Sequence, residues 1–296
     1  MYQFLSAGTT MTIVLLVNLA TILTVTSDQK FNEAHYKRLP PGYSYGYLQT
    51  SPTEQFSTSR NLLACTAISL KSQSELFTYN KVSHVCKNYS PKNIMTVVST
   101  NDSNEMSYFR SSEWIKTYAI SVGANSLIYN SILNIGSPST WKVDKCNGAY
   151  CPNFFRHPIL DIWKSLPIDQ VKLVLYKKKT AVVTMVFNGR NTTLENWFSA
   201  KNLKSSPWND LATSPQNSFS MAGAVNIRRF YVSAFHNACP GDAGWLCINE
   251  KFHVCTWERS SYFPSIIYSN TKAKTIWHNG YGTADSMAIF IRMKPN

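Results

Sequence analysis

The chain is poor in acidic side chains. Sixteen aspartates and glutamates stand against 29 lysines and arginines among 296 residues, and the formal net charge is +13. Hydrolysis by two carboxylates could draw on Asp161, Glu195 or Asp242, but the sequence does not show whether any two of them converge. The surplus of cations favours anionic partners such as sulfated glycans, acidic glycoproteins or lipid head groups. A dispersed charge that only confers solubility is the alternative.

Metal-ligand patterns are also missing. The six histidines stand apart from one another, and no Cys-x-x-Cys or His-x-x-x-His pair occurs. The aspartates are too scattered to form the carboxylate cluster that calcium requires. We therefore predict no metal site and no cofactor.

Long apolar runs are rare. One run, over residues 11–23, is shorter than the about 20 residues of a membrane span. We interpret residues 1–27 as a signal peptide, although residues 1–10 carry no charge. The chain is then secreted and extracellular, with no stable membrane span after cleavage, and nucleic acid is disfavoured as a partner. An uncleaved signal anchor is the alternative.

In a secreted chain, cysteines can form disulfides and Asn-x-Ser/Thr acceptors can be glycosylated. The Asn-x-Ser/Thr acceptors are Asn88, Asn101 and Asn191, each in a polar stretch suited to a surface loop. Seven cysteines in an oxidising compartment predict disulfides, and the odd count leaves one cysteine free or intermolecular.

Residues 36–112 combine one short helix with several strands. Residues 40–47, rich in proline, glycine and tyrosine, are expected to form a loop. Strands are expected over 76–80 and 82–87 as a hairpin, and over 94–99 and 106–110. The helix is expected over 59–71, with an apolar face of Leu62, Leu63, Thr66, Ala67 and Leu70.

A cysteine on a helix, a Phe-Thr-Tyr-Asn strand and a second cysteine resemble the PAN/apple module of secreted proteins. The resemblance implies an α+β recognition module and a disulfide between Cys65 and Cys86. Ser69, and Ser74 or Glu75, stand where the family has two further cysteines. The absence of both cysteines is expected if this chain has lost one disulfide of the family, because the loss of only one would leave an unpaired thiol.

Residues 113–140 are interpreted as a linker or as the first strands of a second domain. Residues 141–296 then alternate short apolar runs with turn residues, which predicts a mainly-β, sandwich-like domain. One helix is expected over 192–203, from a capping-box pattern. The strands are expected over 170–176, 180–187, 228–234, 244–248, 265–268 and 286–292.

Several segments of residues 141–296 are similar to an uncharacterised β-rich domain of secreted invertebrate proteins, often found beside apple modules. Examples are Asn-Phe-Phe-Arg-His-Pro from residue 153 and Cys-Pro-Gly-Asp-Ala-Gly-Trp-Leu from residue 239. The resemblance implies architecture and compartment, and no chemistry. Suggested disulfides are Cys146 with Cys151 and Cys239 with Cys255, which leaves Cys247 over.

The segment from Cys239 also resembles the nucleophile loop of trypsin-like proteases. Ala243 occupies the place of the nucleophilic serine, and Trp245 replaces the glycine that follows it. Because alanine has no oxygen to attack a carbonyl, the segment is expected to be a turn between strands rather than an active site.

Binding has more support than catalysis. Trp163, Trp197, Trp245 and Trp257 lie in apolar runs and are expected in the core. The candidate ligand contacts are Lys177, Lys178 and Lys179 at a hairpin tip, and Trp277, Asn279 and Tyr281 in a turn-rich loop. The sequence thus predicts a secreted, non-catalytic protein that recognises carbohydrate or protein. A hydrolase with its site in residues 141–296, or a matrix component assembled through the odd cysteine, are the alternatives.

Overall fold

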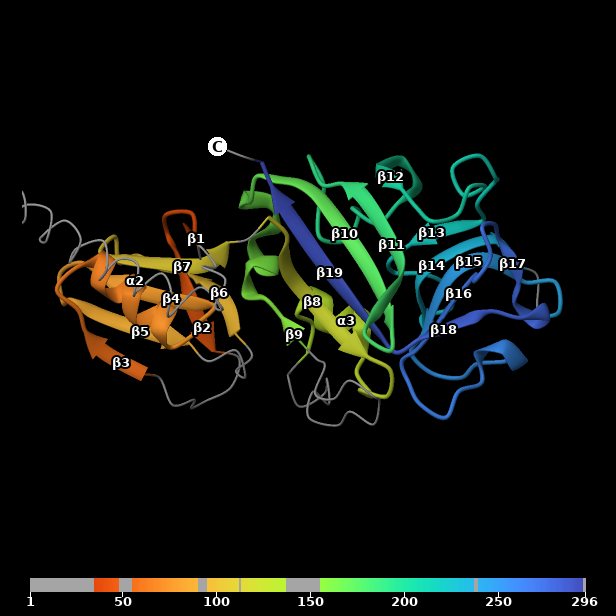
Figure 1. Ribbon diagram of the computed structural model, residues 1–296, viewed down its shortest axis with the longest axis horizontal. Coiled ribbons are helices and arrows are strands. Elements are labelled where there is room, and N and C mark those ends of the chain that lie inside the picture. The colour runs from red at the N-terminus through yellow and green to blue at the C-terminus, as the bar shows by residue number, and fades with distance from the viewer. Residues whose placement is uncertain are drawn as a thin grey trace, which may run out of the picture. The chain divides into compact units, whose positions relative to one another are not determined.

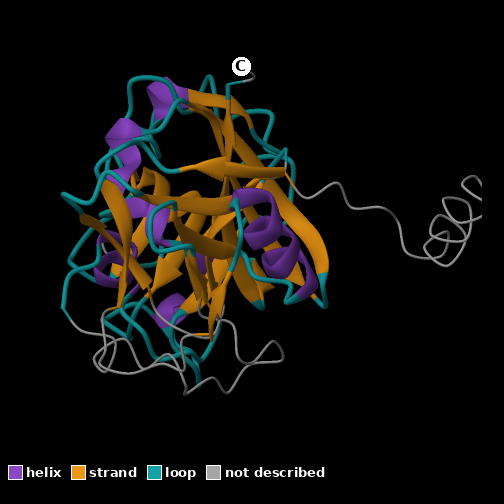
Figure 2. Cartoon of the chain, turned by 90° about the vertical axis from the view of Figure 1, so that its left-hand side faces the viewer, coloured by secondary structure: helices purple, strands orange, loops and turns teal. Residues whose placement is uncertain are grey.

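The computed structural model describes residues 35–47, 55–89, 95–111, 113–136, 155–236 and 239–294 (Figure 1). The chain divides into a unit of residues 1–35 and a unit of residues 36–296. The predicted signal peptide and the suggested bridge between Cys146 and Cys151 lie outside the described residues. Strands predominate over short helices in the described part, so the fold is mainly β (Figure 2). Within it, no helix is both long and apolar enough to span a bilayer.

The segment after residue 35 forms a five-stranded sheet, sheet 1, and a separate two-stranded pair. The predicted hairpin of 76–80 and 82–87 is present, although its second strand begins three residues later than expected. The order of sheet 1 is β1 (His35–Arg38), β7 (Glu105–Ser111), β4 (Leu76–Asn80), β5 (Val85–Tyr89) and β3 (Gln55–Thr58).

The prediction of a loop over 40–47 is wrong in its second half. Residues 43–47 form β2 (Tyr43–Tyr47), which pairs antiparallel with β6 (Met95–Ser99). The turn that precedes β2 contains Gly42 at a φ of 84°, a backbone conformation that glycine adopts without strain. Tyr43 and Tyr45 lie two residues apart and therefore on the same side of β2, where Tyr45 is buried and Tyr43 is partly exposed.

The predicted helix exists as α2 (Leu62–Lys71), but the predicted apolar face is wrong. The side chain of Asn61 caps the helix by accepting a hydrogen bond from the Ala64 amide. The buried side chains are Cys65 and Ser69, whereas Leu63 is 78% exposed. The disulfide from Cys65 to β5 sets the rotation of the helix about its axis, so leucine spacing does not decide which face is covered.

Residues 113–136, for which the sequence left a linker or leading strands open, contain β8 (Ile115–Ser121) and α3 (Ile128–Leu133). β8 pairs antiparallel with β19 (Ser286–Met293), a strand 165 or more residues further along the chain. β8 therefore belongs to the sheet of the later half. The signal for this pairing is non-local, which is why the apolar residues of this segment showed no clear period.

Two six-stranded sheets follow. All six strands expected in residues 141–296 are present at the expected positions. Sheet 2 has the order β12 (Leu203–Ser205), β11 (Thr180–Asn188), β10 (Ile168–Lys177), β19, β8 and β9 (Phe155–Arg156). Sheet 3 has the order β13 (Ser218–Ser220), β14 (Arg228–Phe235), β15 (Ala243–Asn249), β16 (Ser265–Tyr268) and β18 (Gly282–Ala284), and β17 (Thr275–Ile276) also pairs with β15. Short 3₁₀ turns are η1 (Pro158–Ser165), η2 (Ala200–Asn202), η3 (Thr256–Glu258) and η4 (Trp277–Asn279).

The helix expected over 192–203 does not form. Thr193 and Asn196 exchange hydrogen bonds, the Thr193 amide to Asn196 Oδ1 at 2.8 Å and the Asn196 amide to Thr193 Oγ1 at 3.2 Å. This pair resembles a capping box, but the chain then turns away, and only η2 is helical. The reason is packing, because the consecutive side chains of Trp197 and Phe198 both contact Phe187 of β11.

An aromatic core joins sheets 2 and 3. The ring centroid of Phe187 in sheet 2 lies 6.1 Å from that of Phe219 in sheet 3, and that of Trp197 lies 6.2 Å from that of Phe230 in sheet 3. The prediction that Trp163, Trp197, Trp245 and Trp257 are core residues is confirmed, since each is at most 4% exposed.

Candidate ligand-binding face and buried charge cluster

The face of sheet 2 that points away from sheet 3 carries cations beside aromatic rings. Strand alternation produces it, because Val171, Leu173 and Leu175 of β10 are fully buried on one side while Lys172 lies on the other. Residues paired across strands share a face, and Phe290 of β19 pairs with Lys172 on one side and with Lys116 of β8 on the other. We call the following set the cation–aromatic face: Trp114, Lys116, Phe155, Lys172, Phe290 and Arg292. All six are at least partly exposed.

Each cation of this face lies over an aromatic ring. Lys172 Nζ is 4.1 Å from the ring centroid of Trp114 and 5.1 Å from that of Phe290. Lys116 Nζ is 4.9 Å from the Phe155 centroid, and the Arg292 guanidinium carbon is 5.3 Å from the Trp114 centroid. Such contacts stabilise by about 0.5–1 kcal/mol each at exposed sites. They also hold flexible cationic side chains in place.

One end of this face is charge-paired. Asp169 Oδ1 accepts from Arg190 Nε at 2.7 Å, and Oδ2 accepts from Arg292 Nη2 at 3.2 Å. The hydrogen bond from Arg190, with support from Arg292, lowers the pKa of Asp169, so this carboxylate stays ionised. Arg292 also lies 3.8 Å from the exposed Glu113.

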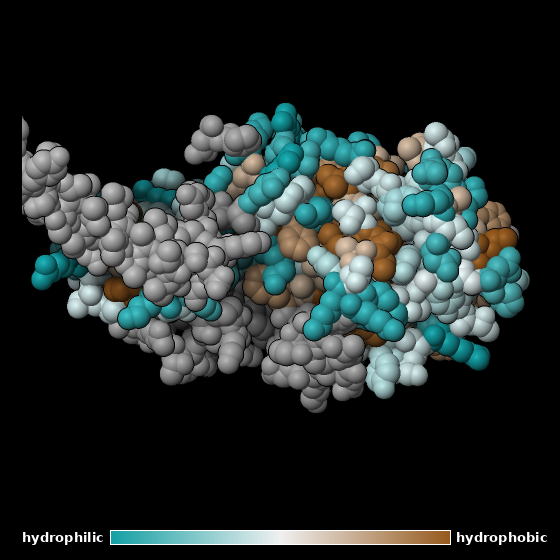
Figure 3. All heavy atoms as spheres, viewed as in Figure 1, coloured by the Kyte–Doolittle hydropathy of each residue, from teal (hydrophilic) through white to brown (hydrophobic). Residues whose placement is uncertain are grey.

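The lysines of this face are not paired in the same way. Among the described residues neither Lys116 nor Lys172 has an ion-pair partner within 4.0 Å. Partial burial lowers the pKa of Lys172, although Glu113 acts in the opposite direction. In Figure 3 hydrophobic residues are interspersed with hydrophilic ones and do not form one continuous apolar face in that view.

The three lysines at the hairpin tip are placed as the sequence suggested. They join β10 to β11, and Lys178 and Lys179 have φ values of 48° and 68°, as a tight hairpin turn requires. Lys177 Nζ lies 3.1 Å from Asp285 Oδ1 and donates to Thr283 at 3.1 Å. The tip therefore presents the two exposed cations Lys178 and Lys179, while Lys177 is already paired.

The turn-rich loop does not present Trp277 as a contact residue, and this prediction is wrong. Trp277 is 1% exposed, and its ring centroid lies 6.0 Å from that of Trp257 in a second small core over sheet 3. Asn279 is exposed and Tyr281 is partly exposed, with its ring against that of Trp277. A tryptophan between strands looked available in the sequence because η3, which covers it, is not adjacent in the chain.

Two of the three glycosylation acceptors are exposed. Asn101 and Asn191 lie on the surface, and Asn191 has a φ of 57° in a turn. Asn88 is 4% exposed, its Oδ1 accepts from Ser69 Oγ at 2.5 Å, and its Nδ2 donates to Cys86 Sγ at 3.9 Å. The expectation of a surface loop at Asn88 is therefore wrong, because this amide is a buried residue of β5.

Two of the suggested disulfides are present. Cys65 is joined to Cys86, with the Cα atoms 5.5 Å apart, and Cys239 is joined to Cys255. Cys247 is the free cysteine of the described residues and is fully buried in β15. Burial raises the pKa of its thiol well above the usual value, which leaves the thiol protonated and unreactive.

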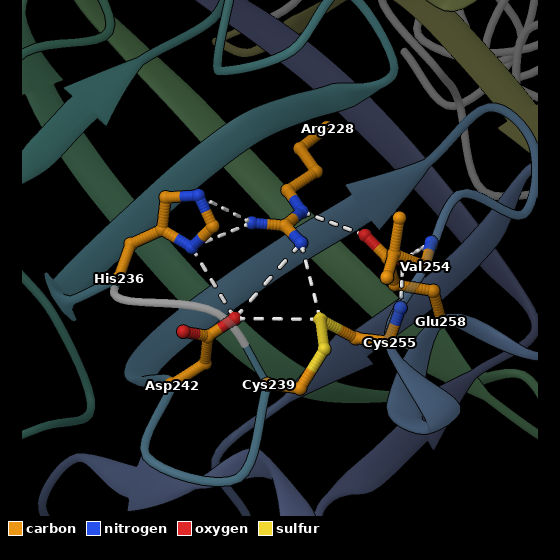
Figure 4. The surroundings of a disulfide bond; sticks show 7 residues. All are labelled: Arg228, His236, Cys239, Asp242, Val254, Cys255 and Glu258. Carbon is orange, nitrogen blue, oxygen red and sulfur yellow. Dashed lines mark hydrogen bonds and ion pairs between the residues drawn. A yellow bond between two sulfur atoms is a disulfide. The ribbon is translucent and has the colours of Figure 1, made fainter.

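The Cys239–Cys255 bridge adjoins a buried set of charges, which Figure 4 shows around the guanidinium of Arg228. Arg228 Nε donates to Glu258 Oε1 at 2.7 Å, and Nη2 lies 3.9 Å from Asp242 Oδ2. Glu258 Oε2 in turn accepts from the backbone amides of Val254 and Cys255, each at 2.8 Å. We call Arg228, His236, Asp242 and Glu258 the Arg228 cluster.

His236 is the one partly exposed member of the Arg228 cluster. Its Nδ1 lies 3.2 Å from Asp242 Oδ2, and Arg228 Nη1 lies 2.8 Å from Nδ1 and 3.2 Å from Nε2. If Nδ1–H donates to Asp242, the remaining lone pair on Nε2 accepts from Arg228. The imidazole then has no free nitrogen for a substrate, and Ala243, beside Asp242, supplies no nucleophile.

The carboxylates that could have formed a hydrolytic pair serve different parts of the structure. Asp161 accepts from Arg156 Nη2 at 2.6 Å and from Thr96 Oγ1 at 2.7 Å, which links η1 to β6. Glu195 is exposed in a turn, and Asp242 belongs to the Arg228 cluster. Within the described part of the chain, no three His, Cys, Asp or Glu side chains are grouped so that they could hold a metal ion.

Comparison with known proteins adds no relative. No protein-family model matches the chain, and neither the curated proteins nor the solved structures contain a match to it. The candidate sites therefore stand on geometry alone.

Sequence reasoning missed the cation–aromatic face. The alternation that predicted β10 already placed Lys172 on the side opposite Leu173. It contained no sign that Trp114, Phe290 and Arg292 lie on the same side, because Trp114 directly precedes β8 and the other two belong to β19, both far from β10 in the chain.

Proposed function

We propose that this is a secreted, N-glycosylated recognition protein that binds carbohydrate without catalysing its turnover. Its first part would be an apple-like module with a reduced set of disulfides, followed by a β-rich domain that carries the ligand. Two disulfides in the described residues suit an oxidising compartment, and Asn101 and Asn191 offer exposed acceptors for glycosylation.

The observation that carries this proposal is the cation–aromatic face. It is a strand surface on which partly exposed rings lie beside cations, and partly exposed Gln170 and Asn188 pair beside Arg292. Rings, amides and charged groups together are the means by which proteins contact the apolar faces and hydroxyls of sugars. A surface of this kind presents no reactive group to its ligand.

The apple-like assignment draws support from the neighbourhood of the two serines. The Ser74 amide donates to the Ser69 carbonyl at 2.9 Å, and both side chains are buried. This contact joins backbone atoms, and a pair of cysteines at the two positions tests whether a second bridge can form there. Oxidation of a Ser69→Cys/Ser74→Cys variant, seen as the loss of two thiols, would support the assignment, and two persistent free thiols would count against it.

A hydrolase is the second candidate, because His236 and Asp242 form an acid–imidazole pair near the surface. The contacts of both ring nitrogens and the alanine at 243 weigh against it. Assembly through Cys247 has less support, because this side chain is fully buried and could not reach a second molecule without unfolding.

A glycan array with neutral and sulfated sugars, run at two salt concentrations, tests the proposal. We expect retention of a restricted set of sugars by the oxidised full chain, with weaker retention at higher salt. Retention of no sugar at either concentration would refute a carbohydrate ligand. Hydrolysis of a sugar on the array would instead show that the protein is a hydrolase, the second candidate.

A further inference from the structure

The cation–aromatic face orders its cations rather than its rings. Lys172 lies over Trp114 and Phe290, and Arg292 also lies near Trp114. Because cations already occupy ring surfaces, the rings have less free area to stack on a neutral sugar. Their main effect is to hold the ammonium groups still, which lowers the entropy lost when an anion binds.

The charges on this side of sheet 2 do not cancel. The cations are Lys116, Lys172, Arg190 and Arg292, and the acids that contact them are Asp169 and Glu113. Asp169 uses both oxygens on the two arginines, so the two lysines are the cations without an acidic partner among the described residues. An anionic ligand would supply that partner.

The spacing of the two lysines favours a chain of anionic groups over a single anion. Lys116, Phe290 and Lys172 form one row across β8, β19 and β10. Adjacent strands lie about 4.8 Å apart, so the backbones of the two lysines are separated by about 10 Å along this row. Their ammonium groups are held over different rings, Lys116 over Phe155 and Lys172 over Trp114 and Phe290, so a polymer with repeated anionic groups can contact both without moving either.

From these contacts we infer that the cation–aromatic face binds a sulfated glycan chain laid across β8, β19 and β10, with anionic groups at Lys116 and at Lys172. The inference rests on the proposed recognition of carbohydrate and names its chemical class. Gln170 and Asn188, in the neighbouring row, would bond hydroxyl groups of the same chain. Because its cations lie beside rings and its neighbouring row carries the amides of Gln170 and Asn188, this surface suits a hydrated polyanion better than an apolar protein partner.

The test compares two double variants of the full oxidised chain, each lacking two positive charges. Lys116→Gln/Lys172→Gln alters the face, and Lys178→Gln/Lys179→Gln alters the exposed hairpin tip as the matched control. The probe is a heparin-derived octasaccharide, with its desulfated form and a polyglutamate peptide as comparisons, measured by calorimetry. We expect the face variant to bind the octasaccharide about fivefold to tenfold more weakly than wild type, and the tip variant to change less than about twofold.

Equal weakening by both variants would show a general charge effect and overturn the inference. Equal affinity for the desulfated octasaccharide, or tighter binding of polyglutamate, would overturn the sulfated class. None of these results refutes the recognition of carbohydrate itself. That proposal is tested by the glycan array, and binding to no sugar on the array would refute it.

A measurement on the wild-type chain covers the case in which the face variant fails to fold. Lysine acylation is mapped by mass spectrometry with and without the octasaccharide. Protection of Lys116 and Lys172, but not of Lys178 and Lys179, is expected. Protection of the tip in place of the face would contradict the inference.

Discussion

Replacement of Arg228 by methionine should destabilise the fold severely. The guanidinium is 1% exposed and lies between the rings of Tyr231 and Trp257, at 5.7 and 4.6 Å from their centroids. Its removal leaves the fully buried carboxylate of Glu258 without its cation and takes the guanidinium away from Asp242, which is also fully buried. Breaking a buried ion pair in this way costs about 3–5 kcal/mol, a large share of the about 5–15 kcal/mol by which domains are stable.

The matched control is Arg190→Met. The Arg190 side chain is 56% exposed, and its partner Asp169 retains Arg292. Water screens such a pair, so the expected loss is about 1 kcal/mol or less. Both variants remove one guanidinium from an ion pair and differ in burial.

Urea unfolding at pH 7, with the disulfides oxidised and tryptophan fluorescence as the signal, measures both losses. If Arg228→Met yields no folded protein, Glu258→Gln serves instead, because glutamine keeps an acceptor for the amides of Val254 and Cys255. A loss for Arg228→Met no larger than that for Arg190→Met would refute the claim that the Arg228 cluster stabilises sheet 3.

Three further predictions concern buried groups. Glycopeptide mapping of protein from a secretory host should find glycans at Asn101 and Asn191 and none at Asn88, because the side-chain amide of Asn88 is buried. A glycan on Asn88 would contradict the placement of β5. A thiol reagent at pH 8 should leave Cys247 unmodified until urea unfolds the chain, because burial raises the pKa of this thiol, and rapid modification of the native protein would show that the strand is open. Burial lowers the pKa of His157 from 6.5 to about 3, so between these pH values the unfolded chain binds a proton at this residue that the folded chain does not. As the pH falls below 6.5, this group should therefore lower the free energy of unfolding by up to about 1.4 kcal/mol per pH unit. Urea titrations at several pH values measure this dependence, and a His157→Gln variant whose free energy of unfolding depends on pH as steeply as that of wild type would refute it.

Local pattern sufficed where an element depends on its own residues. Period-two alternation predicted β10 and β11, because each strand buries one side against sheet 3. The Cys65–Cys86 bridge was expected from the family resemblance and not from local pattern, and both it and the suggested Cys239–Cys255 bridge are present. Tryptophans inside apolar runs were correctly expected in the core, since burial of a large ring is favoured in any packing.

Local pattern failed where a distant contact sets the outcome. The Cys65–Cys86 bridge sets the rotation of α2, so that Leu63 and Leu70 are exposed. The joint packing of Trp197 and Phe198 against Phe187 prevents a helix that a capping pattern predicted. Trp277 became a core residue because η3 covers it.

The sequence by itself determined that this protein is mainly β, where most of its strands lie, and that it carries a strong surplus of positive charge. The tertiary structure alone decided which of those charges act together. Lys116, Lys172 and Arg292 are up to 176 positions apart in the chain and become neighbours of Trp114 and Phe290 only when β8 pairs with β19 and β19 pairs with β10. Antiparallel pairing depends on a register between remote segments, and no local period encodes that register.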